Sequence, residues 1–217
     1  MESYVDNYWQ VKLNQVRERL RENNFEAHVV SDPQHARTLV LDSIIPDADP
    51  GIISWAGSGT FKEIGLYDAL SKQSGISIID TYKKEKSREQ VIETRRKALL
   101  CDLFFTGTNA VTESGVLVNL DMIGNRTGAI TFGPKYVVVL AGRNKVVSDI
   151  ESAVDRIKNY AAPANAMRLD KKTPCVKTGE CEDCSSPDRI CNVWTITEKS
   201  FPKSRIKVVL INRDLGL

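Results

Sequence analysis

Four cysteines between residues 175 and 191 constrain this chain more than any other feature of its sequence. The stretch CVKTGECEDCSSPDRIC has the spacing Cys-x5-Cys-x2-Cys-x6-Cys, formed by Cys175, Cys181, Cys184 and Cys191. The 217-residue chain has only five cysteines, so four of them are gathered in one short segment. The residues between them are mainly glycine, proline, serine and aspartate, which form turns and bury little surface. We therefore expect this loop to be ordered by a group that the four thiols bind together.

Three kinds of crosslink remain open for these thiols. They are an iron–sulfur cluster on four thiolates, a structural Zn²⁺ in a closed four-thiolate site, and a pair of disulfides, which form mainly in oxidising compartments. Zinc sites more often carry two Cys-x2-Cys pairs, whereas only Cys181 and Cys184 have this spacing here. The asymmetry favours the cluster. We expect a [4Fe-4S] cluster, with Zn²⁺ as the alternative.

Composition predicts an ordinary globular protein rather than a nucleic-acid or membrane protein. Hydrophobic residues make up 41% of the chain, charged residues 27%, and the formal net charge is +2. This small charge gives no reason to expect nucleic acid or acidic lipid as a partner. The N-terminus lacks the apolar run of a signal peptide, and no stretch approaches the length of a membrane helix. We expect a cytoplasmic protein, in a compartment where thiols stay reduced.

Strand and helix patterns alternate over the first hundred residues. They predict a helix over 3–24, a strand over 27–30, a helix from the N-cap Asp32 to near Pro46, a strand over 51–55, a helix over 61–72, a strand over 76–81, and a helix that runs from a Ser87–Gln90 capping box to Leu100. Such alternation is typical of an α/β fold with a mostly parallel sheet and flanking helices.

The pattern changes over residues 103–141, where short apolar runs are separated by glycines. The runs LFF, VLVNLDM, AITFG and YVVVLAG each predict a strand. A helix is predicted over 147–167, followed by the cysteine loop and by strands over 193–197 and 206–211, which we expect to frame that loop and seat it on the main sheet. The chain thus divides into an α/β domain over 1–170, with its N-terminal helix, and a segment over 171–217 packed on the same domain.

A glycine-rich turn, Gly57-Ser58-Gly59-Thr60, lies between a predicted strand and a predicted helix. This arrangement points backbone N–H groups at an anion, and the hydroxyls of Ser58 and Thr60 can add donors. The Gly-Lys-Ser/Thr ending of a P-loop is missing, and a plain tight turn followed by an N-cap is the alternative. We expect these four residues to bind a small anionic ligand.

Four polar residues of the strand-rich stretch are further candidates. Glu113 lies in a glycine-bounded turn, where carboxylates for general acid–base chemistry are often held. Asn109 and Thr112 can orient it or bind substrate hydroxyls. Arg126 can pair with a substrate carboxylate through two hydrogen bonds. For Glu113 and Arg126, a solvated surface turn is the alternative.

Residues 106–144, TGTNAVTESGVLVNLDMIGNRTGAITFGPKYVVVLAGRN, resemble the LUD (lactate-utilisation) family, which includes the LutC and YkgG proteins. The resemblance extends over about residues 29–169. It implies a fold like that of the sugar-phosphate isomerases and CoA transferases (NagB/RpiA-like), in which the position matching Gly57 to Thr60 commonly binds phosphate. The Glu113-Ser114-Gly115 turn is similar to the Glu-Asn-Gly turn of CoA transferases, with Ser114 in place of the asparagine.

Two functions follow from the resemblance together with the cysteines, which look like those of a LUD subgroup with a cysteine motif. In the first, the protein is an electron-transfer component of lactate (2-hydroxy acid) utilisation, with an iron–sulfur or dehydrogenase partner. In the second, it is an enzyme that binds a phosphate- or CoA-type ligand, with Glu113 as the catalytic carboxylate and the cysteines as a structural zinc or cluster site. A non-catalytic assembly subunit is a third reading, and the fold implies a homodimer.

Overall fold

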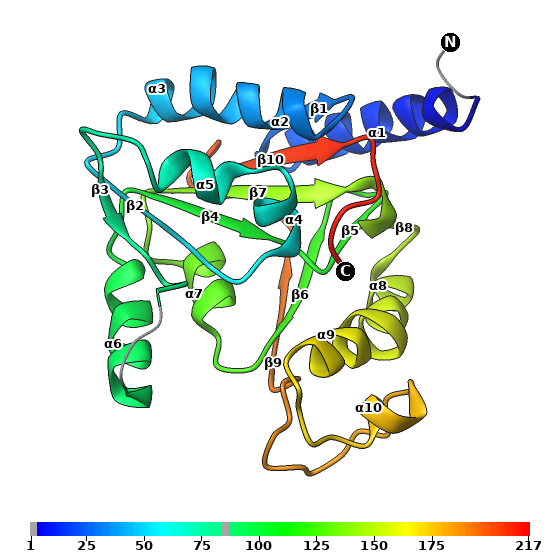
Figure 1. The fold of residues 1–217 in the computed structure, drawn as a ribbon. Helices are drawn as coiled ribbons and strands as arrows, with labels where there is room; N and C mark the ends of the chain where they lie inside the picture. The colour runs from blue at the N-terminus through cyan, green and yellow to red at the C-terminus, as the bar shows by residue number, and fades with distance from the viewer. Residues whose placement is uncertain (1–3, 84–86) are drawn as a thin grey trace.

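The protein was analysed as a computed structural model that describes residues 4–83 and 87–217. Within these residues, the centre is a six-stranded sheet in which every pair of neighbours is parallel (Figure 1). Its order is β1 (Glu26–Val30), β10 (Ile206–Ile211), β7 (Tyr136–Gly142), β4 (Leu103–Gly107), β2 (Ile52–Trp55) and β3 (Ser77–Ile79). The expected α/β class with a mostly parallel sheet is therefore confirmed.

Helices cover both faces of this sheet. The helices of the described residues are α1 (Tyr4–Glu22), α2 (Pro33–Leu39), α3 (Ile45–Ala48), α4 (Gly59–Glu63), α5 (Leu66–Leu70), α6 (Arg88–Ala98), α7 (Asn125–Thr131), α8 (Ile150–Arg156), α9 (Ala162–Arg168) and α10 (Cys175–Thr178), with π-helical turns η1 (Val40–Ile44) and η3 (Ile157–Ala161) and a 3₁₀ turn η2 (Arg143–Lys145). None of the described helices is both long and apolar enough to cross a membrane.

Two clusters of buried hydrophobic residues cover this sheet, one on each face. Helices α1, α6 and α7 pack on one face, and α2, α3, α4 and α5 pack on the other. The central strands β4 and β10 are buried along their whole length. Parallel strands covered on both faces have no solvent side, which explains why these runs are almost continuously apolar.

A second, four-stranded sheet extends from the main one. Its order is β8 (Val146–Val147), β5 (Ala110–Thr112), β6 (Leu117–Asp121) and β9 (Val193–Thr197), and β9 pairs antiparallel with β6. The two final strands, β9 and β10, therefore belong to different sheets, and the expectation that both seat the cysteine loop on the main sheet was wrong. The strand β10 is inserted between β1 and β7, because its apolar sequence IKVVLI suits a fully buried position.

Three local predictions differ from the structure. The run AITFG, predicted as a strand, mostly belongs to helix α7, whose Ala129 and Ile130 face the core. The helix predicted over 61–72 is divided into α4 and α5 by Gly65, which has a φ of 73°. The helix predicted to stop near Pro46 runs two residues further, through the π-helical turn η1 and α3 to Ala48, and ends at Asp49, which has a φ of 40°.

Candidate functional site

A cleft of about 350 Å³, called the polar cleft below, opens at the carboxyl ends of the parallel strands. Ligands of open parallel sheets bind at this edge, because successive strands deliver their following loops there. The loop after β2 supplies Gly57, Ser58 and Gly59, and the loop after β4 supplies Asn109. Its lining also includes Glu63, Asp121, Arg126, Lys145, Asn165, Arg168 and Ile190.

The glycine-rich turn lines the polar cleft, but the charge of the cleft arises elsewhere. The Ser58 hydroxyl accepts a 3.2 Å hydrogen bond from the Phe61 backbone and caps α4. The Ser58 N–H donates to the Tyr82 hydroxyl at 3.1 Å. Because α4 has five residues, it adds little macrodipole at its N-terminus. Positive charge in the cleft therefore comes from side chains.

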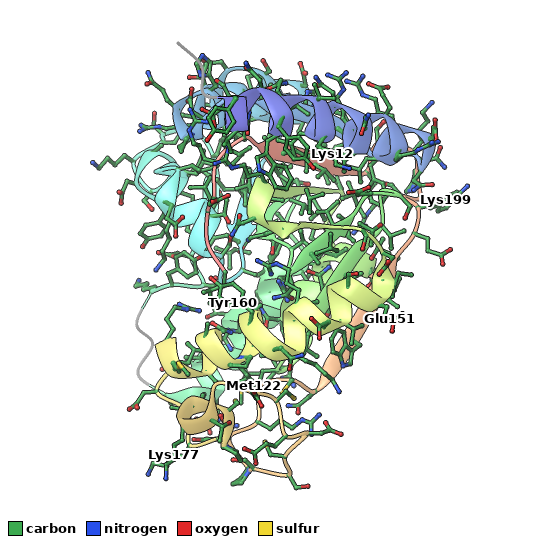
Figure 2. The ribbon with its side chains drawn as sticks, turned by 90° about the vertical axis from the view of Figure 1, so that its right-hand side faces the viewer. Lys12, Met122, Glu151, Tyr160, Lys177 and Lys199 are labelled. Carbon is green, nitrogen blue, oxygen red and sulfur yellow. The ribbon has the colours of Figure 1, made fainter. Side chains whose placement is uncertain are left out.

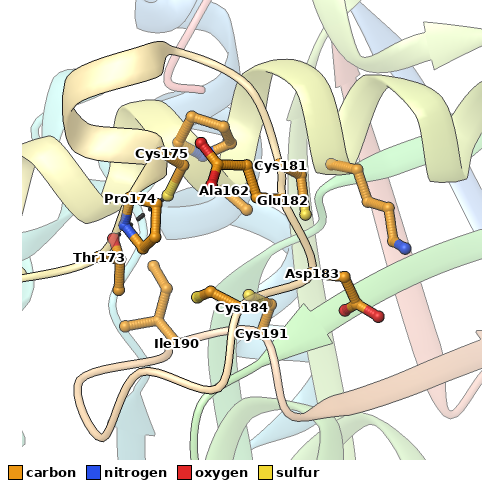
Figure 3. A pocket seen from close by; sticks show the side chains of 12 residues that line it. Ala162, Thr173, Pro174, Cys175, Cys181, Glu182, Asp183, Cys184, Ile190 and Cys191 are labelled. Atoms are coloured by element: carbon orange, nitrogen blue, oxygen red, sulfur yellow. Dashed lines mark hydrogen bonds between the residues drawn. The ribbon is translucent and has the colours of Figure 1, made fainter.

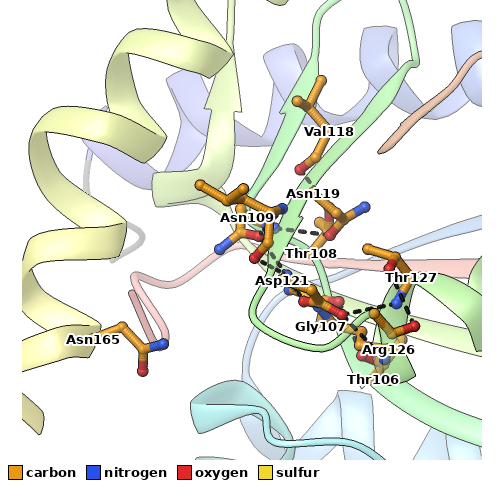
Figure 4. A network of polar contacts seen from close by, with 12 residues as sticks. Thr106, Gly107, Thr108, Asn109, Val118, Asn119, Asp121, Arg126, Thr127 and Asn165 are labelled. Atoms are coloured by element: carbon orange, nitrogen blue, oxygen red, sulfur yellow. Dashed lines mark hydrogen bonds and ion pairs between the residues drawn. The ribbon is translucent and has the colours of Figure 1, made fainter. Parts of the chain in front are cut away.

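Arg126 lines the polar cleft and forms an ion pair with a neighbouring carboxylate (Figure 4). Its guanidinium lies 2.7 Å from an Asp121 carboxylate oxygen, donates to the Asn109 side-chain oxygen at 2.6 Å and reaches the Leu120 carbonyl at 2.9 Å. Asp121 also accepts the backbone N–H groups of Arg126 and Thr127. This network joins β6 to the start of α7 and fixes the wall of the cleft.

Lys145 is a cleft residue that the sequence analysis missed. It ends the turn η2 just beyond β7, is 4% exposed, and donates a 3.0 Å hydrogen bond to the Thr60 hydroxyl. Burial, followed by the positive charges of Arg156 and Arg126, lowers the pKa of Lys145 to about 7, and Glu63 opposes this shift. One signal in the sequence could have identified Lys145: it follows an apolar strand of a parallel sheet, where ligand-binding residues often lie.

The structure places the remaining predicted residues, Thr112 and Glu113, outside the polar cleft. The Glu113 carboxylate accepts a 2.9 Å hydrogen bond from Lys12 on α1 and lines a separate surface hollow with Arg19. Thr112 is buried, with its hydroxyl 2.8 Å from that of Ser114. Figure 2 shows Lys12 at the opposite end of the molecule from Lys177, which belongs to the cysteine loop.

The Thr-Glu-Ser-Gly turn has a packing role in this structure. Gly115 has a φ of 78°, and a Cβ placed there would lie 2.7 Å from the Leu20 backbone nitrogen and 2.8 Å from the Arg19 carbonyl carbon. The side chain of Asn23 donates to the Ser114 carbonyl at 2.9 Å. The turn is therefore the surface against which the end of α1 docks.

The four cysteines of the loop line one small cavity of about 20 Å³, called the cysteine cavity below (Figure 3). Cys175 begins α10 and lies 3.2 Å from the Thr173 hydroxyl, whereas the other three lie in irregular segments. All four are half-buried free thiols. The fifth cysteine, Cys101, belongs to the core, where burial raises the pKa of its thiol to about 12.

A single arginine holds the cysteine loop together. Arg189 donates to the Cys184 carbonyl at 2.6 Å and to the Cys191 carbonyl at 2.9 Å, and pairs with Asp183 at 2.7 Å. Burial raises the pKa of the Cys191 thiol, and the positive charge of Arg189 opposes this effect. These contacts tie the backbone of the loop together, and the expectation that a group bound by the four thiols orders it stays a prediction.

The donor set of the cysteine cavity suits a thiophilic metal group. Soft thiolates are the ligands that iron–sulfur clusters and zinc select. In the described part of the chain, no three His, Cys, Asp or Glu side chains are grouped as metal coordination requires. The thiols therefore surround a common space without already forming a coordination shell. Ile190 lines both the cysteine cavity and the polar cleft, so the two are adjacent.

Comparison with solved structures gives a full-length neighbour. A DUF162 family protein from Deinococcus radiodurans shares 13% identity, with 94% of this chain and 98% of that chain covered and a TM-score of 0.51, a likeness of fold alone. The eIF2B delta protein of Chaetomium thermophilum matches at 12% identity, 69% and 57% coverage and a TM-score of 0.29.

Comparison of sequences places the chain in a family. No curated protein sequence matches it. The model of the LUD domain matches residues 13–211, which include most of the lining of the polar cleft, the cysteine loop and both sheets. The chain therefore belongs to the LUD domain family.

Proposed function

We propose that this LUD domain protein is an electron-transfer component that holds a [4Fe-4S] cluster in the cysteine cavity. The observation that carries the proposal is the convergence of Cys175, Cys181, Cys184 and Cys191 on one cavity. A cluster held by four thiolates supplies a one-electron donor or acceptor. The adjacent polar cleft can hold a small molecule that would exchange electrons with the cluster.

The surroundings of the cysteine cavity support a negatively charged group. Arg189 bonds the backbone of two cysteines, and Lys158 of η3 lines the cavity. The positive charge of Arg189 opposes the rise that burial causes in the pKa of Cys191, and positive charges beside the cavity stabilise a bound group that is negative overall. Half-burial limits the access of water and oxidants to the sulfurs.

We further propose that the electrons come from oxidation of a 2-hydroxy acid such as lactate, delivered by a dehydrogenase or iron–sulfur partner. Membership of the LUD family supports this link. The alternative, an enzyme with Glu113 as catalytic carboxylate, has less support, since that carboxylate pairs with Lys12 outside the polar cleft. The structure gives no independent reason to favour it.

The test is the metal content of anaerobically purified protein. We expect about four iron and about four acid-labile sulfide per chain, with a visible absorption that bleaches on reduction by dithionite and an accompanying EPR signal. The variant Cys184→Ser should lose iron, whereas the matched control Cys101→Ser, a core position outside the cavity, should keep it. Zinc without iron in the purified protein would overturn the redox proposal and leave a structural site.

A further inference from the structure

Three basic side chains at the polar cleft form no ion pair with a carboxylate of the described residues. Lys145 and Arg168 line the cleft, and Arg156 lies close enough to Lys145 to lower its pKa. None of the three forms an ion pair within residues 4–83 and 87–217. Each can therefore attract an anion while it is charged.

The partners of these cations are neutral oxygens. Lys145 donates to the Thr60 hydroxyl at 3.0 Å. Arg168 donates twice to the Asn165 side-chain oxygen, at 3.1 and 2.7 Å. Arg156 donates to the backbone carbonyls of Asn144 and Asn109 at 3.0 and 2.8 Å. Such dipoles orient the cations but leave their charge uncompensated.

The acidic groups of the cleft are already engaged. Asp121 is paired with Arg126 at 2.7 Å and accepts two backbone N–H groups. Glu63 accepts the Gly216 N–H at 2.9 Å and acts on Lys145 only over a longer range. Burying a cation without a carboxylate costs free energy unless another negative group lies beside it. The site therefore favours the binding of an anion.

We propose that the polar cleft binds a small oxyanion, a carboxylate or a phosphate-type group, which accepts a hydrogen bond from Lys145 and has Arg168 as its second positive contact. The cleft volume of about 350 Å³ lies near the lower end of the range for small-molecule sites, so the ligand is small. Thr60 positions the Lys145 amine, and the preceding residues Ser58 and Gly59 also line the cleft. This site does not depend on what the cysteines bind.

Binding of the anion is linked to a proton. With its pKa near 7, the Lys145 amine is mostly neutral at pH 8 in the free protein. Since an anion favours the charged amine, the complex takes up a proton from solvent above pH 7. Affinity then falls by up to about tenfold for each pH unit above that point. The other charged groups that act on Lys145 are Arg156, Arg126 and Glu63.

The experiment is calorimetric titration of the full chain with oxalate and, separately, with sulfate, between pH 6.5 and 8.5. Neither anion changes charge in this range, so any pH dependence belongs to the protein. We expect Lys145→Met to weaken binding at least tenfold. The control Lys97→Met, the same change at an exposed position of α6, should bind as the wild type does. Stronger binding of oxalate indicates a carboxylate ligand, and stronger binding of sulfate a phosphate-type ligand.

A second variant keeps the proposal falsifiable. Lys145→Arg retains a positive charge that does not titrate, so we expect it to bind with an affinity that changes little over the same pH range. Binding of neither anion by the folded wild type at about 10 mM would overturn the proposal. Equal binding by the wild type and Lys145→Met would also overturn it. The same titration of Cys184→Ser separates this site from the cluster, because oxalate or sulfate should still bind there.

Discussion

The Lys145 amino group donates a 3.0 Å hydrogen bond to the hydroxyl of Thr60, 85 residues earlier in the chain. That hydroxyl lies 3.3 Å from the Leu215 carbonyl, to which it donates in turn. Thr60 is completely buried and does not line the polar cleft. It contributes to the cleft by holding Lys145, a lining residue that forms no ion pair with a carboxylate of the described residues.

Thr60→Val should weaken anion binding while preserving the shape of the side chain. The substitution removes the acceptor for Lys145, so the amine loses its orientation and its pKa falls further. We expect a several-fold loss of oxalate affinity by calorimetry, and a loss of about 1–3 kcal/mol in the free energy of urea unfolding, since two buried groups lose a partner. Thr106→Val is the control, because this buried hydroxyl on β4 donates only to the adjacent Gly107 carbonyl. Equal oxalate affinity in both variants would contradict the positioning role of Thr60.

Lys145→Met should stabilise the protein at low pH. The folded pKa of about 7 lies below the ordinary value of 10.5, so the unfolded chain binds more protons between these values and wild-type stability rises with pH across that window. Below pH 7 the wild type carries the full cost of a buried charge. We expect the variant to unfold several degrees higher at pH 6, with a smaller difference at pH 9, in thermal melts without anion. A difference of the same size at both pH values would refute a depressed pKa for Lys145.

Asp121→Asn should be strongly destabilising. It leaves the Arg126 guanidinium, whose side chain is only 11% exposed, without its carboxylate. Breaking a buried pair by removing one partner costs about 3–5 kcal/mol, which urea unfolding can measure. Asp183→Asn removes the carboxylate of an exposed pair with Arg189 and should change global stability little. If both variants lost the same stability, the Arg126 network would not be the support for the cleft wall.

Gly115→Ala should loosen the docking of α1. The added methyl group meets the α1 backbone at 2.7 Å, and the residue is also held at a φ of 78°. Gly75→Ala is a matched control, since its φ is 88° and nothing lies within 4 Å of the added Cβ. The control should lose about 1 kcal/mol of stability from the backbone alone. We expect a clearly larger loss for Gly115→Ala by urea unfolding, and similar losses would show that α1 does not press on this turn.

Local signals in the sequence identified many elements of the fold. The strands over 193–197 and 206–211 have the predicted limits, and the Ser87–Gln90 capping box begins α6. Both signals depend on neighbouring residues, which act before any tertiary contact forms. The prediction of a strand for AITFG was wrong, because a short apolar run does not distinguish a strand from a helix. Packing against the core decides between the two.

The sequence by itself determined the alternating α/β pattern, the glycine-rich turn after β2 and the gathering of four thiols in one polar loop. Only the tertiary structure decided which polar residues share a site. It separated Glu113 from the polar cleft and brought Lys145 to Thr60, because the order of strands in the sheet depends on packing between residues far apart in the chain. No spacing within the sequence encodes that order.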